Sequence, residues 1–341
     1  MELRPLGHTG VQVSSFCLGA MMFGAWGNPD HDESTKIIHA ALEAGINFID
    51  TADVYGAGES EEIVGKALGA GRRDDVVLAT KFHNPMGEDP NRRGNSRRWI
   101  MRAVEDSLRR LNTDWIDLYQ VHRPDPSTDI EETLSALSDL VQQGKIRYIG
   151  SSTFPASEIV EAQWTARDRR LQRFVTEQPP YSILVRGVEA DVLPTCVRHG
   201  MAVMSYSPLA GGWLSGRWRK DTGQQSSSRA GRLPERFDLA NPHNQRKLDA
   251  VEQLAQLAEQ AGLTLIQLAI GFAKSHPAIT SPLIGPRTME QLQTQLAAAD
   301  VVLADDVLDR IDEIVPPGTT INPADTSFDN PALAPPARRH H

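Results

Sequence analysis

The stretch that most narrows the fold of this chain is Ile46-Asn-Phe-Ile-Asp-Thr-Ala-Asp-Val-Tyr-Gly56. Its apolar run ends in the carboxylate of Asp50, and the phenol of Tyr55 follows five residues later. Two further apolar runs end in the same way, at Lys81 and at His122. Short apolar runs bounded by polar residues are typical of buried strands. The sequence therefore predicts three strands that each end in an ionisable side chain.

The same pattern continues along the chain. Polar residues close further apolar runs at Ser152, Gln178 and Tyr206, and each interval is about one strand and one helix long. The intervening segments have the apolar spacing of amphipathic helices, and several of them stop at glycine. With residues 11–18 as the first strand and residues 279–284 as the last, the chain has eight such units. Eight alternating units predict a (β/α)8 barrel, in which functional residues lie at the C-terminal ends of the strands.

The segment between Tyr206 and Gly285 is too long for one strand–helix unit. Its first part, residues 211–244, is polar and rich in arginine and serine, which predicts either a lid or a disordered loop. Residues 250–261 and 263–274 then have the apolar spacing of two helices.

The chain from residue 316 is rich in proline and does not fit a regular element. It either wraps the barrel or extends from it. We therefore predict one barrel domain over residues 1–315, with an N-terminal β-hairpin and two extra helices, and a proline-rich tail over residues 316–341.

The composition limits the class of protein and its partners. The formal net charge of −9 argues against nucleic acid or an anionic membrane as the main partner. Two cysteines are too few for a disulfide framework, and the ten histidines are scattered without the spacing of metal ligands. No apolar run reaches the ~18 residues of a membrane span, and the first residues lack the pattern of a signal peptide. We therefore expect a cytoplasmic protein without a metal site, and the oligomeric state stays open.

Asp50, Tyr55, Lys81 and His122 together suit the reduction of a carbonyl group, which needs a hydride on carbon and a proton on oxygen. A free phenol has a pKa of ~10 and is a poor proton donor at neutral pH. An ammonium group beside Tyr55 would lower that pKa, so Lys81 would tune a general acid. Asp50 would keep Lys81 charged, and His122 would donate a hydrogen bond to the carbonyl oxygen. One such residue at a strand end is usually a cap or a turn residue, but four on consecutive units favour catalysis.

These residues resemble the catalytic set of the aldo-keto reductases, and the resemblance extends over about residues 2–315. Leu18-Gly-Ala-Met-Met-Phe-Gly24 is similar to the loop after the family's first strand. Gly58-Glu-Ser-Glu61 is similar to the branch that contains the potassium-channel β-subunits, and Ser205-Tyr-Ser-Pro-Leu-Ala-Gly-Gly212 resembles the family's cofactor motif. The resemblance implies a (β/α)8 barrel that reduces aldehydes or ketones to alcohols with NADPH, with Tyr55 as the general acid.

The resemblance also implies how the nicotinamide end of NADPH binds. Tyr206 would stack against the nicotinamide ring, and Gln178 would bond its carboxamide group. The motif Gly150-Ser-Ser-Thr-Phe154 stands where the family usually has Gly-x-Ser-Asn-Phe. Ser152 therefore matches the family pattern, and Thr153 replaces an asparagine.

For the phosphates of the cofactor, the chain has no Rossmann or P-loop motif. The better candidate is Leu283-Ile-Gly-Pro-Arg-Thr-Met-Glu-Gln291, which combines a strand, a tight turn and a helix N-terminus where Arg287 would hold the 2′-phosphate. Gln291 either contacts the cofactor, as in the family, or caps the helix with Thr288. The predicted cofactor-binding residues in full are Ala20, Met21, Asp50, Ser152, Gln178, Tyr206, Ser207, Pro208, Leu209, Gly211, Arg217, Arg229, Gly285, Arg287, Gln291 and Gln295.

The substrate pocket is predicted from loop residues. Trp26, Phe82 and Trp213 would form an apolar, aromatic wall, which suits small reactive aldehydes, dicarbonyls or an aromatic ketone. His83 either lines the mouth of the pocket or is a solvated loop residue.

Two other functions stay open at this point. One is a cofactor-binding, redox-sensing regulatory subunit like the channel β-subunits, which carry asparagine where this chain has His122. The other is a barrel isomerase or aldolase that uses Lys81 as a Schiff-base nucleophile. It is disfavoured because Asp50 would hold that lysine charged and unreactive.

Overall fold

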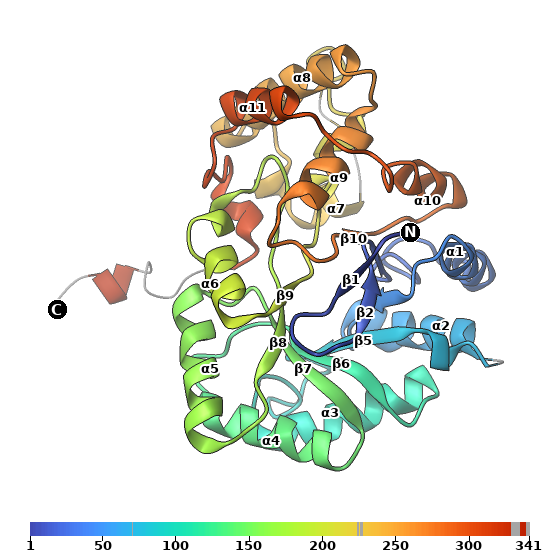
Figure 1. Ribbon diagram of the computed structural model, residues 1–341, viewed down its shortest axis with the longest axis vertical. Helices are drawn as coiled ribbons and strands as arrows, with labels where there is room; N and C mark the ends of the chain where they lie inside the picture. The colour runs from blue at the N-terminus through green and yellow to red at the C-terminus, as the bar shows by residue number, and fades with distance from the viewer. Residues whose placement is uncertain (70, 224, 226–227, 329–334, 339–341) are drawn as a thin grey trace.

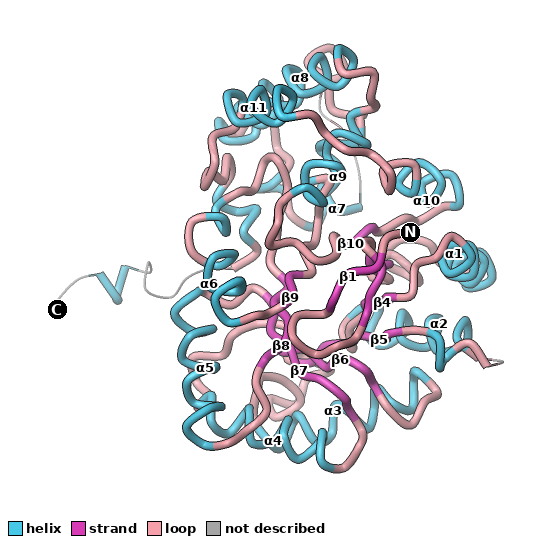
Figure 2. The backbone as a smooth tube through the Cα atoms, in the orientation of Figure 1, coloured by secondary structure: helices cyan, strands magenta, loops and turns pink. Residues whose placement is uncertain are grey.

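The computed structural model of the protein describes residues 1–69, 71–223, 225, 228–328 and 335–338. Eight strands form one parallel sheet in the order β10-β3-β4-β5-β6-β7-β8-β9. The backbone N–H of Leu283 donates to the carbonyl oxygen of Ser205 at 2.7 Å, which brings the two edges of the sheet together. The strands gather at the centre of the molecule and helices surround them (Figure 1, Figure 2). The predicted (β/α)8 barrel is confirmed.

The strands of the barrel are short, and most of them lead into a helix on the outside. The barrel strands are β3 (Cys17–Gly19), β4 (Phe48–Asp50), β5 (Val77–Phe82), β6 (Ile116–Val121), β7 (Ile146–Ser152), β8 (Phe174–Gln178), β9 (Ala202–Val203) and β10 (Leu283–Ile284). The helices are α1 (His31–Glu43), α2 (Glu59–Leu68), α3 (Arg97–Leu111), α4 (Ile130–Gln142), α5 (Ala156–Arg169), α6 (Val192–His199), α7 (Ser228–Arg232), α8 (Pro242–Gln260), α9 (Leu265–Ser275), α10 (Met289–Leu296) and α11 (Asp305–Ile314).

Helix α3 illustrates why the apolar stripes of the sequence become helices. Ser96 caps the first turn by accepting a hydrogen bond from the backbone N–H of Trp99, and Asn112 ends the helix in the left-handed conformation, with φ 50°. The apolar face, which includes Ile100 and Val104, is buried in the main hydrophobic core. Burial of one such side chain stabilises the fold by about 1.5–3 kcal/mol.

The predicted first strand, residues 11–18, is in fact two strands. The first, β2 (Gln12–Ser14), pairs antiparallel with β1 (Leu3–Pro5) and forms the predicted N-terminal β-hairpin, whereas β3 enters the barrel. The chain changes sheet at Ser15, whose backbone N–H donates to the carbonyl oxygen of Glu2. Both segments are extended and partly apolar, so the sequence pattern does not mark the change of sheet.

The predicted last strand, residues 279–284, is shorter than expected because only β10 joins the sheet. The backbone N–H groups of Thr280 and Ser281 both donate to the carbonyl oxygen of Val203. The chain therefore bends across the end of β9 before it pairs with β3.

Two long helices, α8 and α9, lie between β9 and β10, as predicted. Helix α8 begins earlier than expected because Asn241 caps it by accepting the N–H of His243, and Pro242 is well tolerated in a first turn. Helix α11 packs against α8 away from the barrel strands (Figure 1). The described part of residues 211–244 is folded, with short helical turns that include Ala210–Ser215, Ser228–Arg232 and Pro234–Arg236.

The first part of the proline-rich tail lies against the rest of the molecule, whereas the short turn Pro335–Arg338 lies away from it (Figure 1). The backbone N–H of Arg186 donates to the carbonyl oxygen of Thr319, and the N–H of Ile321 donates to the carbonyl oxygen of Leu184. Further along, Asp325 is buried. Beyond residue 328 most of the predicted tail lies outside the described residues.

Candidate active site

Three of the predicted catalytic residues meet at the C-terminal end of the barrel. Asp50 pairs in register with Ala79, and Lys81 lies two residues further along β5, so both side chains are on the same face of the sheet. The Nζ atom of Lys81 donates to Asp50 Oδ2 at 2.5 Å and to the carbonyl oxygen of Thr51 at 2.8 Å, and the Asp50 and Lys81 side chains are buried. The hydroxyl of Tyr55 lies 3.4 Å from the same Nζ atom.

The carboxylate of Asp50 has further partners inside the barrel. Its Oδ1 atom accepts hydrogen bonds from Gln120 Nε2 at 2.9 Å and from Gln178 Nε2 at 3.0 Å. Gln178 was predicted to bond the nicotinamide carboxamide, and here its amide nitrogen bonds Asp50. Gln120 was not predicted, although it lies two residues before His122 and therefore shares its face of β6. Two neutral amides thus fix the aspartate that pairs with Lys81.

The pKa values of Lys81 and Tyr55 are both raised. Burial alone would lower the pKa of Lys81, but the Asp50 carboxylate and the Tyr55 phenol oppose that effect, and the pKa of Lys81 is raised. Burial raises the pKa of Tyr55, and the Lys81 ammonium opposes the rise without cancelling it. The predicted net lowering of the Tyr55 pKa is therefore wrong for the protein alone, because burial of the phenol outweighs the effect of the Lys81 ammonium and the Asp50 carboxylate adds to the rise. Tyr55 stays protonated at neutral pH.

His122 completes the cluster at the end of β6. Its ring lies edge-on to the Tyr55 ring, with 5.8 Å between the centroids. Burial and then the neighbouring cations Arg123 and Lys81 lower the pKa of His122 well below its usual value, so the imidazole is neutral. The side-chain amide nitrogen of Asn84 lies 2.9 Å from Nδ1 and can only donate. The ring proton is therefore on Nε2, where it can be donated.

The ring of Trp26 lies beside that of Tyr55. The two rings are 5.9 Å apart, and the guanidinium of Arg232 lies 5.2 Å from the Trp26 ring. The loop that carries Trp26 is held by Glu59, whose carboxylate accepts the backbone N–H of Ala25 at 2.7 Å. Trp26, which was predicted for the wall of the substrate pocket, therefore lies beside the phenol of Tyr55.

Phe82 and Trp213 do not form the predicted pocket wall. Phe82 follows the inward-facing Lys81 and so faces the opposite side of the sheet, where it is fully buried 4.9 Å from the ring of Tyr119. Trp213 is also fully buried, and its ring stacks on that of Trp218 at 4.1 Å. Both aromatic side chains are part of the core in this structure. His83 is partly buried, and its Nδ1 atom lies 2.9 Å from the side-chain oxygen of Asn95.

The predicted nicotinamide end of the site has a strained backbone. Thr153 and Ser207 both have φ 59°, a left-handed conformation that is rare for residues other than glycine and is an outlier for a β-branched residue. The Thr153 hydroxyl lies 3.4 Å from the hydroxyl of Tyr206. Ala210 (φ 49°) and Gly211 (φ 70°) continue the left-handed backbone. Backbone strain of this kind concentrates at functional sites. Asparagine tolerates the left-handed conformation better than threonine, so the presence of Thr153 in place of the family's asparagine hinted at this strain in the sequence.

Glu177 is a buried carboxylate behind this turn that the sequence analysis did not identify. Its Oε2 atom accepts from the hydroxyl of Ser151 at 2.5 Å, and its Oε1 atom accepts from the backbone N–H of Phe154 at 3.2 Å. Burial raises the pKa of Glu177 to about 7, and these donors limit the rise. The side chain therefore fastens the two residues on either side of the turn at Ser152 and Thr153.

The predicted phosphate end lies between β10 and α10. Thr288 caps α10 by accepting the N–H of Gln291, whose side-chain oxygen accepts the N–H of Arg287 at 2.9 Å. Gln291 thus takes the capping role that the sequence left open. Within the described part of the chain, the guanidinium groups of Arg287 and Arg217 have no carboxylate within ion-pair distance. Gln295 is buried in the packing face of α10, so little of its side chain is available to a cofactor.

The other predicted cofactor-binding residues lie near the C-terminal ends of the barrel strands. Ser152 is buried, and its hydroxyl donates to the carbonyl oxygen of Gln178 at 2.9 Å. The side chain of Arg229 lies outside the described residues. The remaining residues of the set follow the C-terminal ends of β3, β9 and β10, namely Ala20, Met21, Pro208, Leu209 and Gly285.

Two structural features are absent from the residues described. No group of three or more His, Cys, Asp or Glu side chains in this part of the chain is arranged to hold a metal ion. No helix in the described ranges is both long enough and apolar enough to cross a membrane.

The chain is similar to known proteins over most of its length. A family model described as the aldo/keto reductase family matches residues 15–316. The uncharacterized oxidoreductase YrpG of Bacillus subtilis is 41% identical over 329 residues, which cover 93% of this chain and 96% of that protein. The aldo-keto reductase YhdN of the same bacterium is 37% identical over 297 residues, 86% of this chain and 87% of that protein. A probable voltage-gated potassium channel subunit beta of Arabidopsis thaliana is 36% identical over 332 residues, 92% of this chain and 97% of that protein. This chain therefore belongs to the aldo/keto reductase family.

Proposed function

We propose that this chain reduces aldehydes or ketones to alcohols with NADPH, and that Tyr55 is the proton donor. Membership of the family indicates an oxidoreductase that acts on carbonyl compounds. The observation that carries the finer proposal is the phenol of Tyr55, 3.4 Å from a buried ammonium that Asp50 keeps charged. His122 lies edge-on beside it.

Tyr55, Lys81 and His122 have different roles in the proton transfer. Tyr55 keeps its proton at neutral pH because its pKa is raised, and it transfers that proton to the carbonyl oxygen as the carbon gains a hydride. The ammonium of Lys81 stabilises the phenolate as it forms. The Nε2 proton of His122 bonds the same carbonyl oxygen and orients it. The phenolate of Tyr55 then regains a proton from water.

The residues present fit NADPH, which supplies the hydride when it is bound. Tyr206 would lie against the nicotinamide, and the N–H of Gly211 would face the diphosphate. The neighbouring N–H groups of Ala210 and Gly212 already donate to backbone carbonyl oxygens. Arg217 and Arg287 have no carboxylate partner among the described side chains, although the whole chain carries a net charge of −9. Unpaired guanidinium groups of this kind suit phosphate oxygens.

The test is an NADPH oxidation assay with a panel of aldehydes and ketones, carried out on wild type and Tyr55→Phe. Removal of a general acid should lower kcat/KM by about 10²–10⁴-fold and leave the Kd of NADPH nearly unchanged. Tyr119→Phe is the matched control, because it removes a buried hydroxyl without a hydrogen-bond partner among the described residues. A Tyr55→Phe protein with more than half of the wild-type activity would refute the assignment.

The same assay separates the second candidate function, a redox-sensing subunit like the channel β-subunits. Such a protein would bind NADPH tightly but oxidise it slowly with every carbonyl compound in the panel. His122 favours the enzyme, because a neutral imidazole with its proton on Nε2 can donate to a carbonyl oxygen.

A further inference from the structure

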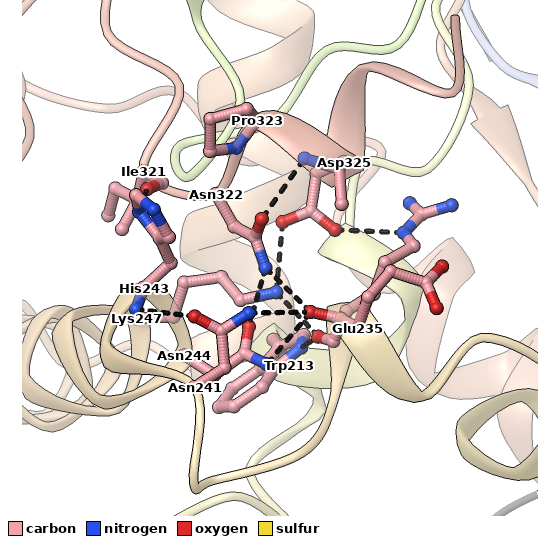
Figure 3. A network of polar contacts seen from close by, with 12 residues as sticks. Trp213, Glu235, Asn241, His243, Asn244, Lys247, Ile321, Asn322, Pro323 and Asp325 are labelled. Carbon is pink, nitrogen blue, oxygen red and sulfur yellow. Dashed lines mark hydrogen bonds and ion pairs between the residues drawn. The ribbon is translucent and has the colours of Figure 1, made fainter. Parts of the chain in front are cut away.

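A buried polar network joins the tail to the long segment between β9 and β10 (Figure 3). The Oδ1 atom of Asp325 accepts from Arg236 Nε at 2.9 Å, and its Oδ2 atom accepts from Lys247 Nζ at 2.9 Å. The Lys247 side chain is fully buried, and that of Asp325 is almost fully buried. We call Arg236, Lys247 and Asp325 the tail clasp. None of the three belongs to the predicted site.

The tail clasp also contacts the segment that carries the predicted diphosphate residues. Lys247 Nζ donates to the carbonyl oxygen of Arg236 at 2.8 Å, and Trp213 Nε1 donates to the same oxygen at 3.2 Å. The Lys247 ammonium lies 4.5 Å from the centre of the Trp213 ring, within the range of a cation–π interaction. Trp213 belongs to the turn Ala210–Ser215, which contains Gly211. The tail clasp therefore fixes both ends of the loop that lies between Trp213 and Arg236.

Apolar packing accounts for only part of the position of the tail, through Ile321, which packs against the main hydrophobic core. A cavity of about 320 Å³ lies between α8 and the tail, lined by residues that include Ala250, Val315 and Pro323. Next to this cavity, Asn322 donates to Asn244 at 2.8 Å and to the carbonyl oxygen of Glu235 at 3.0 Å (Figure 3). Polar contacts thus hold this part of the tail over α8 and the loop.

Asp325 is the residue on which the network depends. Burial lowers the pKa of Lys247 to about 8, while the Asp325 carboxylate opposes that shift and the Arg236 guanidinium adds to it. Without the carboxylate, two cations would face each other beside the rings of Trp213 and Phe237. One of them would have to lose its proton or move towards water.

We propose that the tail clasp positions the cofactor-binding turn Ala210–Ser215, so that NADPH affinity depends on Asp325, which touches neither cofactor nor substrate. This inference rests on the proposed function, because it assumes that this turn meets the diphosphate. Asp325 and Lys247 are positioning residues, and they act through Arg236 and Trp213.

The experiment compares wild type with Asp325→Asn, which keeps the shape of the side chain and removes its charge. Residues that act on a binding site from a distance typically change coupling by factors of about 2 to 30. We expect the Kd of NADPH, measured by calorimetry, to rise by that factor and NADPH release to become faster. The kcat at saturating NADPH should not fall. Without cofactor, hydrogen exchange should speed up in residues 210–217 and 234–237 and stay unchanged in β4 and β5.

Asp117→Asn is the matched control. It breaks another partly buried ion pair, with Arg73 at 2.7 Å, near the start of β6 and so away from the strand ends that form the site. It should lower stability without changing the Kd of NADPH. Lys247→Met, which leaves Asp325 paired with Arg236, provides the measurement if Asp325→Asn does not fold.

The outcomes separate the two proposals. An unchanged Kd together with unchanged exchange in residues 210–217 would show that the tail clasp only anchors the tail. If wild type itself fails to bind NADPH, the proposed function is wrong. The exchange comparison, which needs no cofactor, then still decides whether Asp325 positions the turn.

Discussion

Lys81 and Lys247 are both buried lysines that pair with an aspartate, at 2.5 Å in the barrel and at 2.9 Å in the tail clasp. Their pKa values nevertheless move in opposite directions. The pKa of Lys81 is raised above its usual value, whereas burial lowers the pKa of Lys247 to about 8. Burial acts against the ammonium form in both places, so the difference must come from the neighbours.

The neighbours of the two aspartates explain the difference. Asp50 accepts its remaining hydrogen bonds from the neutral amides of Gln120 and Gln178, so Lys81 is its sole cationic partner among the described residues. Asp325 divides its charge between Lys247 and a second cation, Arg236, which also repels the lysine. Two buried Lys–Asp pairs can therefore have opposite lysine pKa shifts and different roles. The barrel pair keeps a cation beside a phenol, and the clasp pair joins two segments of chain.

The largest expected effect is the loss of kcat/KM in Lys81→Met, and Lys247→Met is the variant to compare with it. Lys81→Met removes the ammonium beside Tyr55 and leaves Asp50 without its cation. We expect kcat/KM to fall by about 10²–10⁴-fold and the free energy of unfolding to fall by about 3–5 kcal/mol. Lys247→Met leaves Asp325 paired with Arg236, so it should retain kcat and lose mainly NADPH affinity. Steady-state kinetics and urea unfolding of both variants test the contrast, and equal losses of kcat would contradict it.

A smaller effect should follow from Arg287→Ala, which tests direct contact with the cofactor against the indirect action of the clasp. A hydrogen bond to a charged group contributes about 1.5–3 kcal/mol, so NADPH should bind roughly 10- to 150-fold more weakly. NADH has no 2′-phosphate and should be barely affected. Titration of both cofactors by tryptophan fluorescence measures the two affinities.

Arg310→Ala is the control for this prediction, because Arg310 is an exposed arginine of α11 that pairs with Glu313. It should leave both affinities unchanged. An equal loss of NADPH and NADH affinity in Arg287→Ala would mean that Arg287 is structural. No loss of either would place the 2′-phosphate on another basic residue.

The smallest effect on function should come from Glu177, a buried carboxylate that is held by neutral donors and not by a paired cation, because it changes only how stability depends on pH. Its pKa of about 7 exceeds the usual 4.5, so between these values the folded protein binds more protons than the unfolded chain. The free energy of unfolding should therefore fall as pH rises from 4.5 to 7, by up to about 1.4 kcal/mol per pH unit from this group. Glu177→Gln should flatten that slope in urea unfolding curves at several pH values. The same slope in both proteins would show that Glu177 does not titrate in this window.

Much of the fold could be predicted because the barrel repeats a local pattern. Asp50, Lys81 and His122 each follow a short apolar run, and such runs recur along the chain at intervals of about one strand and one helix. The residue next to an inward-facing side chain must face outward, so the alternation of β5 already excluded Phe82 from the pocket. Gln120 was hidden for a different reason, because a single amide inside an apolar run looks like part of the strand.

The rest depends on contacts that no local pattern encodes. Arg236, Lys247 and Asp325 lie in three separate segments, and each by itself is an ordinary charged residue of a loop, a helix or a tail. The direction of the Tyr55 pKa shift was equally hidden, because it depends first on how deeply the phenol is buried and then on how far Asp50 offsets Lys81. Contacts between residues at the ends of neighbouring barrel strands could be predicted from the sequence, whereas contacts between a loop, a helix and the tail could not.

The position of Asp325 in the sequence has a consequence for the order in which the protein is completed. Translation reaches this residue only after all eight barrel strands and every proposed catalytic residue have been made. Until then Arg236 and Lys247 lack the carboxylate that lies between them in the finished protein. On the proposal made above, a chain that stops short of Asp325 would contain all eight barrel strands but bind NADPH more weakly.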